Sequence, residues 1–306
     1  MAEHPFADNE IERNEKAGWC RKRWEKDHAS EEPMPYYSWE TKRCRLAEVD
    51  MEGFCRVMEG RKGLLIVGDS LSNQMALALA TILHADHIVD KPKEHHKWLA
   101  CEGTVTLTFR RNDYLDTRTH PSFYHRTHCE AVERSRGTLC TVFADDDTLS
   151  AHDTIVVNSG AHPRPVDTYS DTMWVASETL AASMKRFHGE DAILVYRNSV
   201  PGHYGCEDMI FDGPVDLVTA LRMQAGAPPT WQWPLFHDFN NRIEAAFDSV
   251  EGWRRLDAYT PTIFRADFHH VGDKQHDCLH YCIPGPIDHW VRLLYNILVA
   301  ETTDRR

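Results

Sequence analysis

The sequence lacks long hydrophobic runs and any excess of basic residues. There are 34 Lys and Arg against 47 Asp and Glu, which gives a formal charge of −13 at pH 7. Non-specific nucleic-acid binding needs surplus positive charge, so this class of partner is excluded, and a neutral or cationic partner fits better. The apolar stretch Met75 to Leu83 is far shorter than the roughly 20 residues of a membrane helix, so we expect no membrane segment in this chain.

Several motifs are also missing. The sequence has no Cys-x-x-Cys pair, which argues against a zinc ribbon or a thioredoxin-type site. It has no His-Glu-x-x-His motif. Residues 1–16 are polar and charged and lack the apolar core of a secretory signal, so they predict a solvated tail. We therefore expect either a cytoplasmic protein or one whose targeting segment is missing from this chain.

The cysteines give a different indication. Disulfides need an oxidising compartment, and composition alone leaves disulfides and free thiols both open here. An odd number leaves at least one thiol unpaired if the others are bridged. The nine cysteines are Cys20, Cys44, Cys55, Cys101, Cys129, Cys140, Cys206, Cys278 and Cys282.

The order of apolar patterns predicts an α/β fold. With 42% hydrophobic and 26% charged residues, the 306-residue chain has an ordinary globular composition, and its length fits one large domain or two small ones. We expect a single domain over residues 17–306. Segments 111–150 and 200–235, rich in Pro, Gly, Asp and aromatic residues, are expected to be long loops. Strands alternating with helices favour a layered domain with a mainly parallel sheet. The predicted strands are Leu64–Val67, Val105–Phe109, Thr154–Val157 and Ile193–Tyr196, and the predicted helices are Leu71–Leu83, Met173–Phe187, Phe239–Phe247 and Ile287–Val299.

The first candidate site residue is Ser70. It follows the run LLIVGD, where a strand is expected to end and a helix to begin. Sites in α/β sheets lie at the carboxyl ends of strands, and a helix N-terminus suits an oxyanion. The alternative is that Asp69 or Ser70 is only a helix N-cap. The G-x-S-x-G elbow of α/β-hydrolases is absent, because position 72 is Ser.

The second candidate is the Asp-x-x-His pair in HDCLHYCIPGPIDHW. A serine hydroxyl is a weak nucleophile until a base removes its proton, and the base needs a carboxylate to fix its tautomer. Asp277 and His280 can supply both groups from one turn. Two alternatives stay open: a chance neighbourhood among 19 histidines, and a metal site built from His276, Asp277, His280 and Cys282.

Two further polar segments follow predicted strands. The segment NSGAH carries Asn158, Gly160 and His162, and an Asn amide at a strand end is a good oxyanion donor. The segment RNSVPGH carries Arg197 and His203, where Arg197 would bind substrate or brace the site. The alternatives are an Asn that satisfies loop backbone and an Arg in a structural ion pair.

Taken together and in this order, these segments resemble the trichome-birefringence-like and PC-esterase family, a branch of the GDSL/SGNH hydrolase-like superfamily. The resemblance covers roughly residues 36 to 296, and its most specific part is the Asp-x-x-His pair beside Cys278 and Cys282 with Pro-Gly following. The matching segments are Tyr37-Ser-Trp39, Cys44, GRKGLLIVGDSLSNQ, DTIVVNSGAH, LVYRNSVPGH, Arg265-Ala-Asp267-Phe-His269 and DCLHYCIPGPIDHWVRLLY.

The resemblance implies an α/β/α sandwich of the SGNH type and a serine acyltransferase. Ser70 would be the nucleophile, with Asp277 and His280 completing the triad, and the acetyl group would pass to hydroxyls of a glycan through an acetyl-serine. No bound cofactor is implied. The co-substrate is an acetyl donor, acetyl-CoA or another acetyl ester. Family members mostly work in the Golgi lumen behind a membrane anchor and form disulfides. The candidate oxyanion or substrate-binding residues are Asn158, Gly160, Asn73, Arg197 and His203.

The sequence also departs from the family pattern. The family run Leu-Ser-Arg-Asn-Gln is here Leu71 to Gln74 without its Arg, Ala161-His162 stands where a Trp usually follows, and Tyr281 replaces the Trp after the catalytic His. The acceptor loops are therefore expected to differ.

Other residues are open to a purely structural interpretation. Trp231 and Trp233 would stack on sugar or anchor a loop. The Arg110-Arg111 pair and the Arg305-Arg306 pair are expected at the solvated surface. A carbohydrate acetylesterase with the same triad and a non-catalytic glycan-binding protein on the same fold remain the alternative functions.

Overall fold

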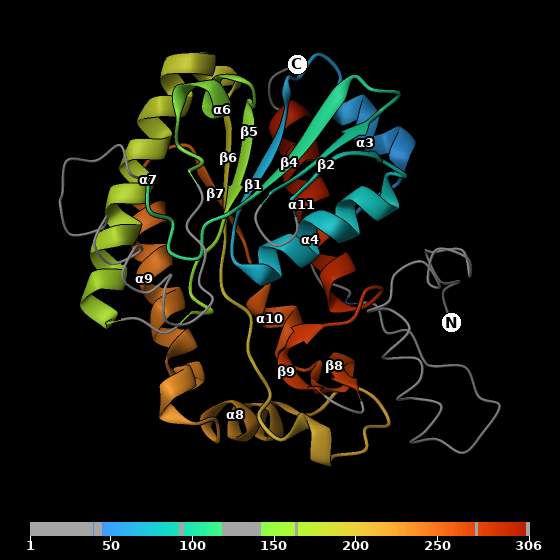
Figure 1. Ribbon diagram of the computed structural model, residues 1–306, viewed down its shortest axis with the longest axis vertical. Helices are drawn as coiled ribbons and strands as arrows, with labels where there is room; N and C mark the ends of the chain where they lie inside the picture. The colour runs from blue at the N-terminus through green and yellow to red at the C-terminus, as the bar shows by residue number, and fades with distance from the viewer. Residues whose placement is uncertain are drawn as a thin grey trace.

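A seven-stranded sheet forms the centre of the protein in the computed structural model, with the order β2-β3-β4-β1-β5-β6-β7 (Figure 1). The structure describes residue 39 and residues 45–91, 95–117, 142–162, 165–272 and 275–303. Strands β4, β1, β5, β6 and β7 run parallel to one another, whereas β3 pairs antiparallel with β4 and β2 pairs antiparallel with β3. The predicted mainly parallel sheet is confirmed.

Helices cover both faces of the sheet, because its strands are apolar on both sides. Along β1 (Gly63–Gly68), Leu64 and Ile66 pack into one core, and Leu65 and Val67 pack into the other. The first core includes side chains of α3, α4 and α11, and the second those of α7 and α9 (Figure 1). Such two-sided burial is typical of parallel sheets, and it gives the expected α/β/α sandwich.

The remaining elements complete this frame. The strands are β2 (Asp86–Lys91), β3 (His95–Ala100), β4 (Val105–Arg111), β5 (Thr154–Val157), β6 (Ile193–Arg197) and β7 (Trp253–Leu256), with β8 (His269–Gly272) and β9 (Gln275–Tyr281) in a separate antiparallel pair. The helices are α3 (Met51–Val57), α4 (Ser70–Ile82), α6 (Asp146–Ser150), α7 (Val166–His188), α8 (Leu217–Ala225), α9 (Phe236–Asp248), α10 (Tyr259–Thr262) and α11 (Pro286–Thr303).

The four predicted strands and four predicted helices all exist, and most bounds agree within three residues, but α7 begins at Val166, seven residues before the predicted start, and α11 ends at Thr303, four residues after the predicted end. Segment 200–235, expected to be a loop, holds α8 and three short 3-10 turns, so that prediction was wrong in part. Within the described ranges, no helix is both long and apolar enough to cross a bilayer. The predicted tail 1–16, Arg305-Arg306 and four of the cysteines (Cys20, Cys44, Cys129 and Cys140) lie outside the described residues.

Disulfides tie distant parts of the chain together. Cys55 of α3 is bonded to Cys101 after β3, and Cys206 is bonded to Cys278 of β9. Cys282 is disulfide-bonded as well. Disulfides persist in oxidising compartments, so these bonds favour a protein that folds outside a reducing cytosol.

Removing the Cys55–Cys101 bond should destabilise the protein without touching the polar carboxyl edge of the sheet. The bond joins two residues that are 46 positions apart in the sequence. Closing a loop of that length lowers the conformational entropy of the unfolded chain, which stabilises the folded protein by about 4 kcal/mol. Urea unfolding of a Cys55→Ala/Cys101→Ala variant measures the loss. An unchanged free energy of unfolding would show that this bond carries no stability.

The carboxyl group of Asp288, in the first turn of α11, should make stability depend on pH. Burial raises the pKa of Asp288 to about 7, although the N–H of Gly285 hydrogen-bonds one carboxylate oxygen and lowers it. Because the folded pKa exceeds the unfolded value, the neutral acid is tolerated at low pH, and stability falls as pH rises from about 4 to 7.

We therefore expect Asp288→Asn to gain stability relative to the native protein between pH 4 and pH 8, by up to about 4 kcal/mol. Thermal unfolding at the two pH values measures this gain. Parallel pH dependence of the two proteins would contradict it.

Candidate active site

Ser70 lies at the carboxyl end of β1, where the strand passes directly into α4. The carboxylate of Asp69 accepts the N–H groups of Leu71 and Ser72, so Asp69 is the helix N-cap and Ser70 is the first helical residue. Of the two residues considered for the helix N-cap, Asp69 has that role. The hydroxyl of Ser70 is therefore available for another partner. The N-terminus of α4 also places partial positive charge beside that hydroxyl.

His280 and Asp277 come from β9 and complete a relay with Ser70. His280 Nε2 lies 2.6 Å from Ser70 Oγ, and His280 Nδ1 lies 2.6 Å from Asp277 Oδ2. The serine and the histidine are 210 residues apart in sequence. The structure therefore brings together the three residues that the sequence singled out, in the order hydroxyl, imidazole, carboxylate.

Asp277 is held as an anion facing the imidazole. Burial alone would raise its pKa, but the hydrogen bond and charge of His280 outweigh burial and lower it. The backbone N–H groups of His280 and Leu279 add to this effect by donating to Asp277 Oδ1 at 3.0 and 3.1 Å. A carboxylate fixed in this way directs Nδ1–H of His280 toward itself and turns Nε2 toward the serine.

Gln74 aligns the two elements that carry the relay. Its side-chain amide donates to the carbonyl of Tyr281 at 2.6 Å and accepts the N–H of Tyr281 at 3.3 Å. Gln74 lies one helical turn after Ser70, and Tyr281 directly follows His280. Both residues are buried, so this reciprocal pair fixes the position of β9 against α4.

Asn158 and Arg197, both predicted for the site, form one buried unit beside Ser72. Arg197 donates to Asn158 Oδ1 at 2.8 Å and to Ser72 Oγ at 3.2 Å, and the Asn158 amide donates to the carbonyl of Arg197 at 2.8 Å. Burial lowers the pKa of Arg197 to about 10, while Asp69 raises it, so the guanidinium stays charged at neutral pH. Arg197 is completely buried, so its contacts are with neighbouring groups of the protein, and its bracing role stays a prediction.

Two glycines let these loops pack closely. Gly68 and Gly160 have φ angles of +156° and +144°, a region that disfavours side chains. A Cβ on Gly160 would lie 2.1 Å from Ser199 Oγ, and one on Gly68 would lie 2.3 Å from Ser72 Oγ. Gly160, a predicted site residue, therefore allows its loop to pack directly against Ser199.

Asn73 and His203 occupy different surroundings. Within the described chain, Asn73 Oδ1 is buried and has no hydrogen-bond partner. His203 lies behind β9, where its ring contacts His269 Nε2 at 2.7 Å and the carbonyl of Ile263 at 2.8 Å. Burial lowers the pKa of His203 to about 4, although the Ile263 contact raises it, so the ring is neutral at pH 7. Both residues are near the relay in the fold, and their roles stay predictions.

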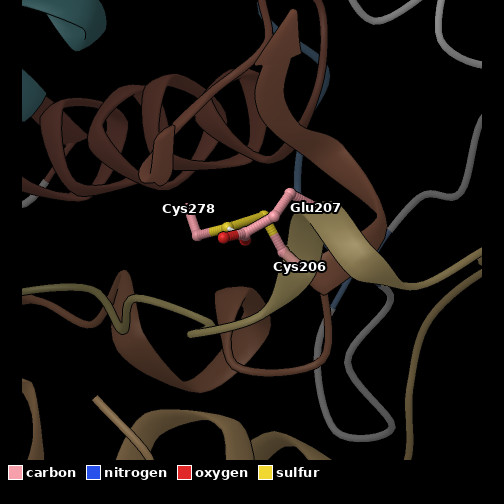
Figure 2. A group of neighbouring side chains, drawn as sticks. All are labelled: Cys206, Glu207 and Cys278. Carbon is pink, nitrogen blue, oxygen red and sulfur yellow. Dashed lines mark hydrogen bonds between the residues drawn. A yellow bond between two sulfur atoms is a disulfide. The ribbon is translucent and has the colours of Figure 1, made fainter. Parts of the chain in front are cut away.

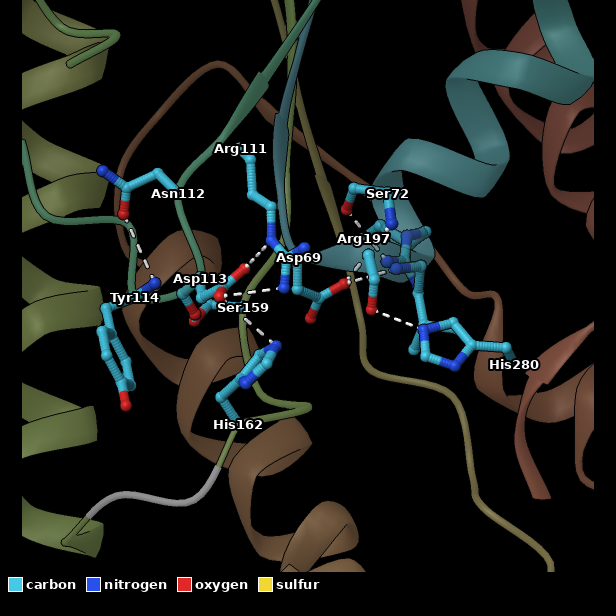
Figure 3. Close-up of polar contacts among 12 residues, drawn as sticks. Asp69, Ser72, Arg111, Asn112, Asp113, Tyr114, Ser159, His162, Arg197 and His280 are labelled. Atoms are coloured by element: carbon cyan, nitrogen blue, oxygen red, sulfur yellow. Dashed lines mark hydrogen bonds and ion pairs between the residues drawn. The ribbon is translucent and has the colours of Figure 1, made fainter. Parts of the chain in front are cut away.

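A second charged cluster at the same edge was missed. Arg111, at the end of β4, binds Asp113 through two nitrogens at 2.8 and 3.2 Å, and His162 Nε2 lies 3.4 Å from Asp113 Oδ2 (Figure 3). The expected exposure of Arg111 is wrong, because this buried pairing holds it at the sheet edge. The signal that could have found it is an Arg and an Asp two apart where a strand ends.

No described residues offer a convincing metal site. One group of possible ligands, Cys206, Glu207 and Cys278, lies together, but both sulfurs are bonded to each other (Figure 2). The alternative built on His276, Asp277, His280 and Cys282 is also poorly supported among the side chains that the structure describes, which do not include that of His276. Asp277 contacts His280, His280 contacts Ser70, and Cys282 is disulfide-bonded. The side chains present therefore favour acid–base and nucleophilic chemistry.

The α/β/α sandwich, with a serine, a histidine and an aspartate at the carboxyl edge of its parallel strands, is consistent with the SGNH-like fold that the sequence resemblance implies. Residues 252–297 match the PC-esterase family, described as a GDSL/SGNH-like acyl-esterase family found in Pmr5 and Cas1p.

Longer matches are to two proteins of Arabidopsis thaliana. Protein trichome birefringence-like 40 is 25% identical over 87% of this chain and 76% of its own length. Protein trichome birefringence-like 42 is 24% identical over 87% of this chain and 78% of its own length. The predicted resemblance to the PC-esterase family and to trichome birefringence-like proteins is confirmed.

Replacing Gln74 by Ala should separate the two halves of the relay. It leaves the N–H and the carbonyl of Tyr281 buried without this partner, which costs about 2–4 kcal/mol. A displacement of about 1 Å between reacting groups costs roughly 10²-fold in rate. We expect both losses, measured by urea unfolding and by turnover of a small acetyl ester.

Asn296→Ala is the control for turnover, because Asn296 of α11 makes the same reciprocal pair of bonds, here exposed, with the backbone of Ala47. We expect this variant to keep its turnover. Equal turnover in the Gln74 and Asn296 variants would contradict the aligning role of Gln74.

Proposed function

We propose that this protein is a serine-dependent O-acetyltransferase that moves an acetyl group to a hydroxyl of a glycan. The observation that carries the proposal is the relay of Ser70, His280 and Asp277, with 2.6 Å at each contact, at the N-terminus of α4. The match to an acyl-esterase family supports the acyl chemistry. The glycan acceptor rests on the family resemblance alone.

The first half-reaction forms an acetyl-serine. Ser70 Oγ attacks the carbonyl carbon of the acetyl donor, and its proton moves to His280 Nε2. Asp277 stabilises the imidazolium that results. As the tetrahedral intermediate collapses, His280 returns the proton to the departing oxygen or sulfur of the donor. The donor is acetyl-CoA or another acetyl ester.

The oxyanion needs two donors during this step. The N–H of Ser70 lies at the start of α4, and the amide of Asn158 has one hydrogen beyond the one it gives to the carbonyl of Arg197. We assign both to the oxyanion, each worth about 2.7–4 kcal/mol of the barrier. Arg197 supports the Asn158 side chain by donating to its oxygen.

The second half-reaction transfers the acetyl group. His280 Nε2 takes the proton of an acceptor hydroxyl, the hydroxyl oxygen attacks the acetyl-serine, and Ser70 Oγ leaves and regains a proton from His280. Water in place of the glycan makes the same site an acetylesterase, and the outcome depends on acceptor binding and water exclusion. We place this activity in the Golgi lumen, a location that the disulfides accommodate.

Intact-mass measurement after brief exposure to 4-nitrophenyl acetate tests the proposal. We expect one acetyl adduct on the native protein, mapped to Ser70 and absent from Ser70→Ala. Ser249→Ala, an exposed serine at the end of α9, is the control and should keep the adduct. A folded, correctly oxidised protein that gives neither adduct nor turnover would rule out the acyl-serine mechanism.

Adding a glycan to the acetylated protein then distinguishes transfer from hydrolysis. Under the proposal, the acetyl group appears on the sugar faster than it appears as acetate. Loss of the adduct to acetate at the same rate with and without sugar would leave an esterase instead.

A further inference from the structure

The exposed apolar side chains are concentrated in one part of the chain. Eight of the twelve exposed large hydrophobic residues in the described structure fall between residues 204 and 235, which lie below the sheet beside β9 (Figure 1). Concentrated exposure of this kind marks a binding surface more often than chance does. The eight residues are Tyr204, Met209, Ile210, Leu217, Val218, Leu221, Trp231 and Leu235.

Two aromatic rings of this group contact each other. Trp231 and Tyr204 are each 42% exposed, and their ring centroids are 5.8 Å apart in an edge-to-face arrangement. We name this pair the aromatic platform. Rings that keep a face in water are suited to stack on the apolar face of a pyranose, because they bring large area at low entropy cost.

Trp233 holds the platform in place from below. It is only 6% exposed, its ring centroid lies 4.9 Å from that of Trp231, and its carbonyl accepts the side-chain amide of Gln224. A Cβ on Gly202 would lie 2.5 Å from the Trp233 ring, so the ring packs directly on that backbone. Of the two tryptophans considered from the sequence, Trp233 is thus the loop anchor, and Trp231 is the exposed one.

The platform is tied to the strand that carries the relay. The N–H of His203 donates to the carbonyl of Cys278 at 2.9 Å, and Cys206 is disulfide-bonded to Cys278. Tyr204 lies between these two attachments, and Cys278 directly follows Asp277. A ligand on the platform therefore has a fixed position relative to His280.

The charge around the platform selects against acidic ligands. Residues 198–235 contain four acids, Glu207, Asp208, Asp212 and Asp216, and one base, Arg222. The last three of these acids are exposed. An anionic polysaccharide or an anionic membrane would be repelled here, whereas an uncharged sugar chain would not.

We propose that Trp231 and Tyr204 form an acceptor subsite that stacks on a sugar unit of a neutral oligosaccharide, several units removed from the acetylated hydroxyl. This inference rests on the proposed function for its choice of a glycan as the ligand. The binding that it predicts does not require acetyl transfer. Affinity should rise with chain length until the chain reaches the platform.

Binding is measured on the Ser70→Ala protein, so that no turnover occurs. The probes are cellohexaose, xylohexaose and mannohexaose, their disaccharides, and hexagalacturonate as the anionic comparison, followed by calorimetry. We expect at least one neutral hexasaccharide to bind tenfold or more tightly than its disaccharide and than hexagalacturonate.

Replacing Trp231 by Ala should weaken that hexasaccharide at least tenfold, which is about 1.4 kcal/mol, and Trp231→Phe should restore most of it. Tyr204→Ala should also weaken hexasaccharide binding. Trp174→Ala is the matched control, because Trp174 is 40% exposed on α7 and should leave affinity unchanged. In the native background, Trp231→Ala should form the acetyl adduct at the normal rate and raise KM for the long acceptor only.

Three results would overturn the platform. The first is that no neutral hexasaccharide binds. The second is equal affinity of the Trp231 and Trp174 variants. The third is that Trp231→Ala abolishes self-association or vesicle binding while glycan affinity stays the same. A missing acetyl adduct in the native protein would instead overturn the proposed function and leave the binding result intact.

Discussion

The relay depends on one buried exchange of hydrogen bonds, between the side chain of Gln74 and the backbone of Tyr281. Helix α4 and strand β9 belong to opposite ends of the chain, and strand β9 is paired only with β8 in the described structure, outside the central sheet. The main sheet therefore does not fix its position. Because the amide of Gln74 both donates to and accepts from one residue, it sets the height and the direction of the strand. Ser70 precedes Gln74 by one turn of α4 and His280 directly precedes Tyr281 on β9, so this pair supports the 2.6 Å contact between Ser70 and His280.

A buried charge supports the same end of the sheet. Arg197 is removed from water, which is costly for a cation unless its donors are satisfied and an anion is near. Its guanidinium donates to Asn158, Ser72 and the carbonyl of Asn198, lies 4.9 Å from the ring of Trp290, and is stabilised by the charge of Asp69. The carboxyl ends of β1, β5 and β6 are thereby joined through one side chain. This arrangement gives the polar edge a fixed geometry, which preorganised oxyanion donors require.

Local sequence predicted the central strands and helices well, because β1, β4, β5 and β6 are short apolar runs and α4 and α11 have clear helical patterns. It failed at β2, whose residues DHIVDK are mostly polar, and at β7, whose Trp253 and Leu256 bracket two arginines, because edge strands are held by pairing more than by apolar content. At the site, Ser70, Asp277 and His280 were predictable from motifs. The pairing of Arg111 with Asp113 and His162 was not, because it depends on how the ends of β4 and β5 meet in space.

The two parts of the candidate site differ in what holds them. Ser70, Gln74 and His280 are placed by buried contacts between α4 and β9, so small changes there reach the chemistry. Trp231 stands on a 3-10 turn that meets the next one at Gln232, which has a φ of +58°, and the adjoining loop is tied to β9 by the Cys206–Cys278 bond. A loop fastened at one strand can change its side chains without moving the relay.

The departures from the family pattern at Ala161-His162 and at Tyr281 lie in different surroundings. His162 faces the polar edge, whereas Tyr281 is buried and donates to the carbonyl of Pro201, so it supports the loop that leads to the platform. Acceptor preference would then be set by residues that the acyl transfer itself does not use.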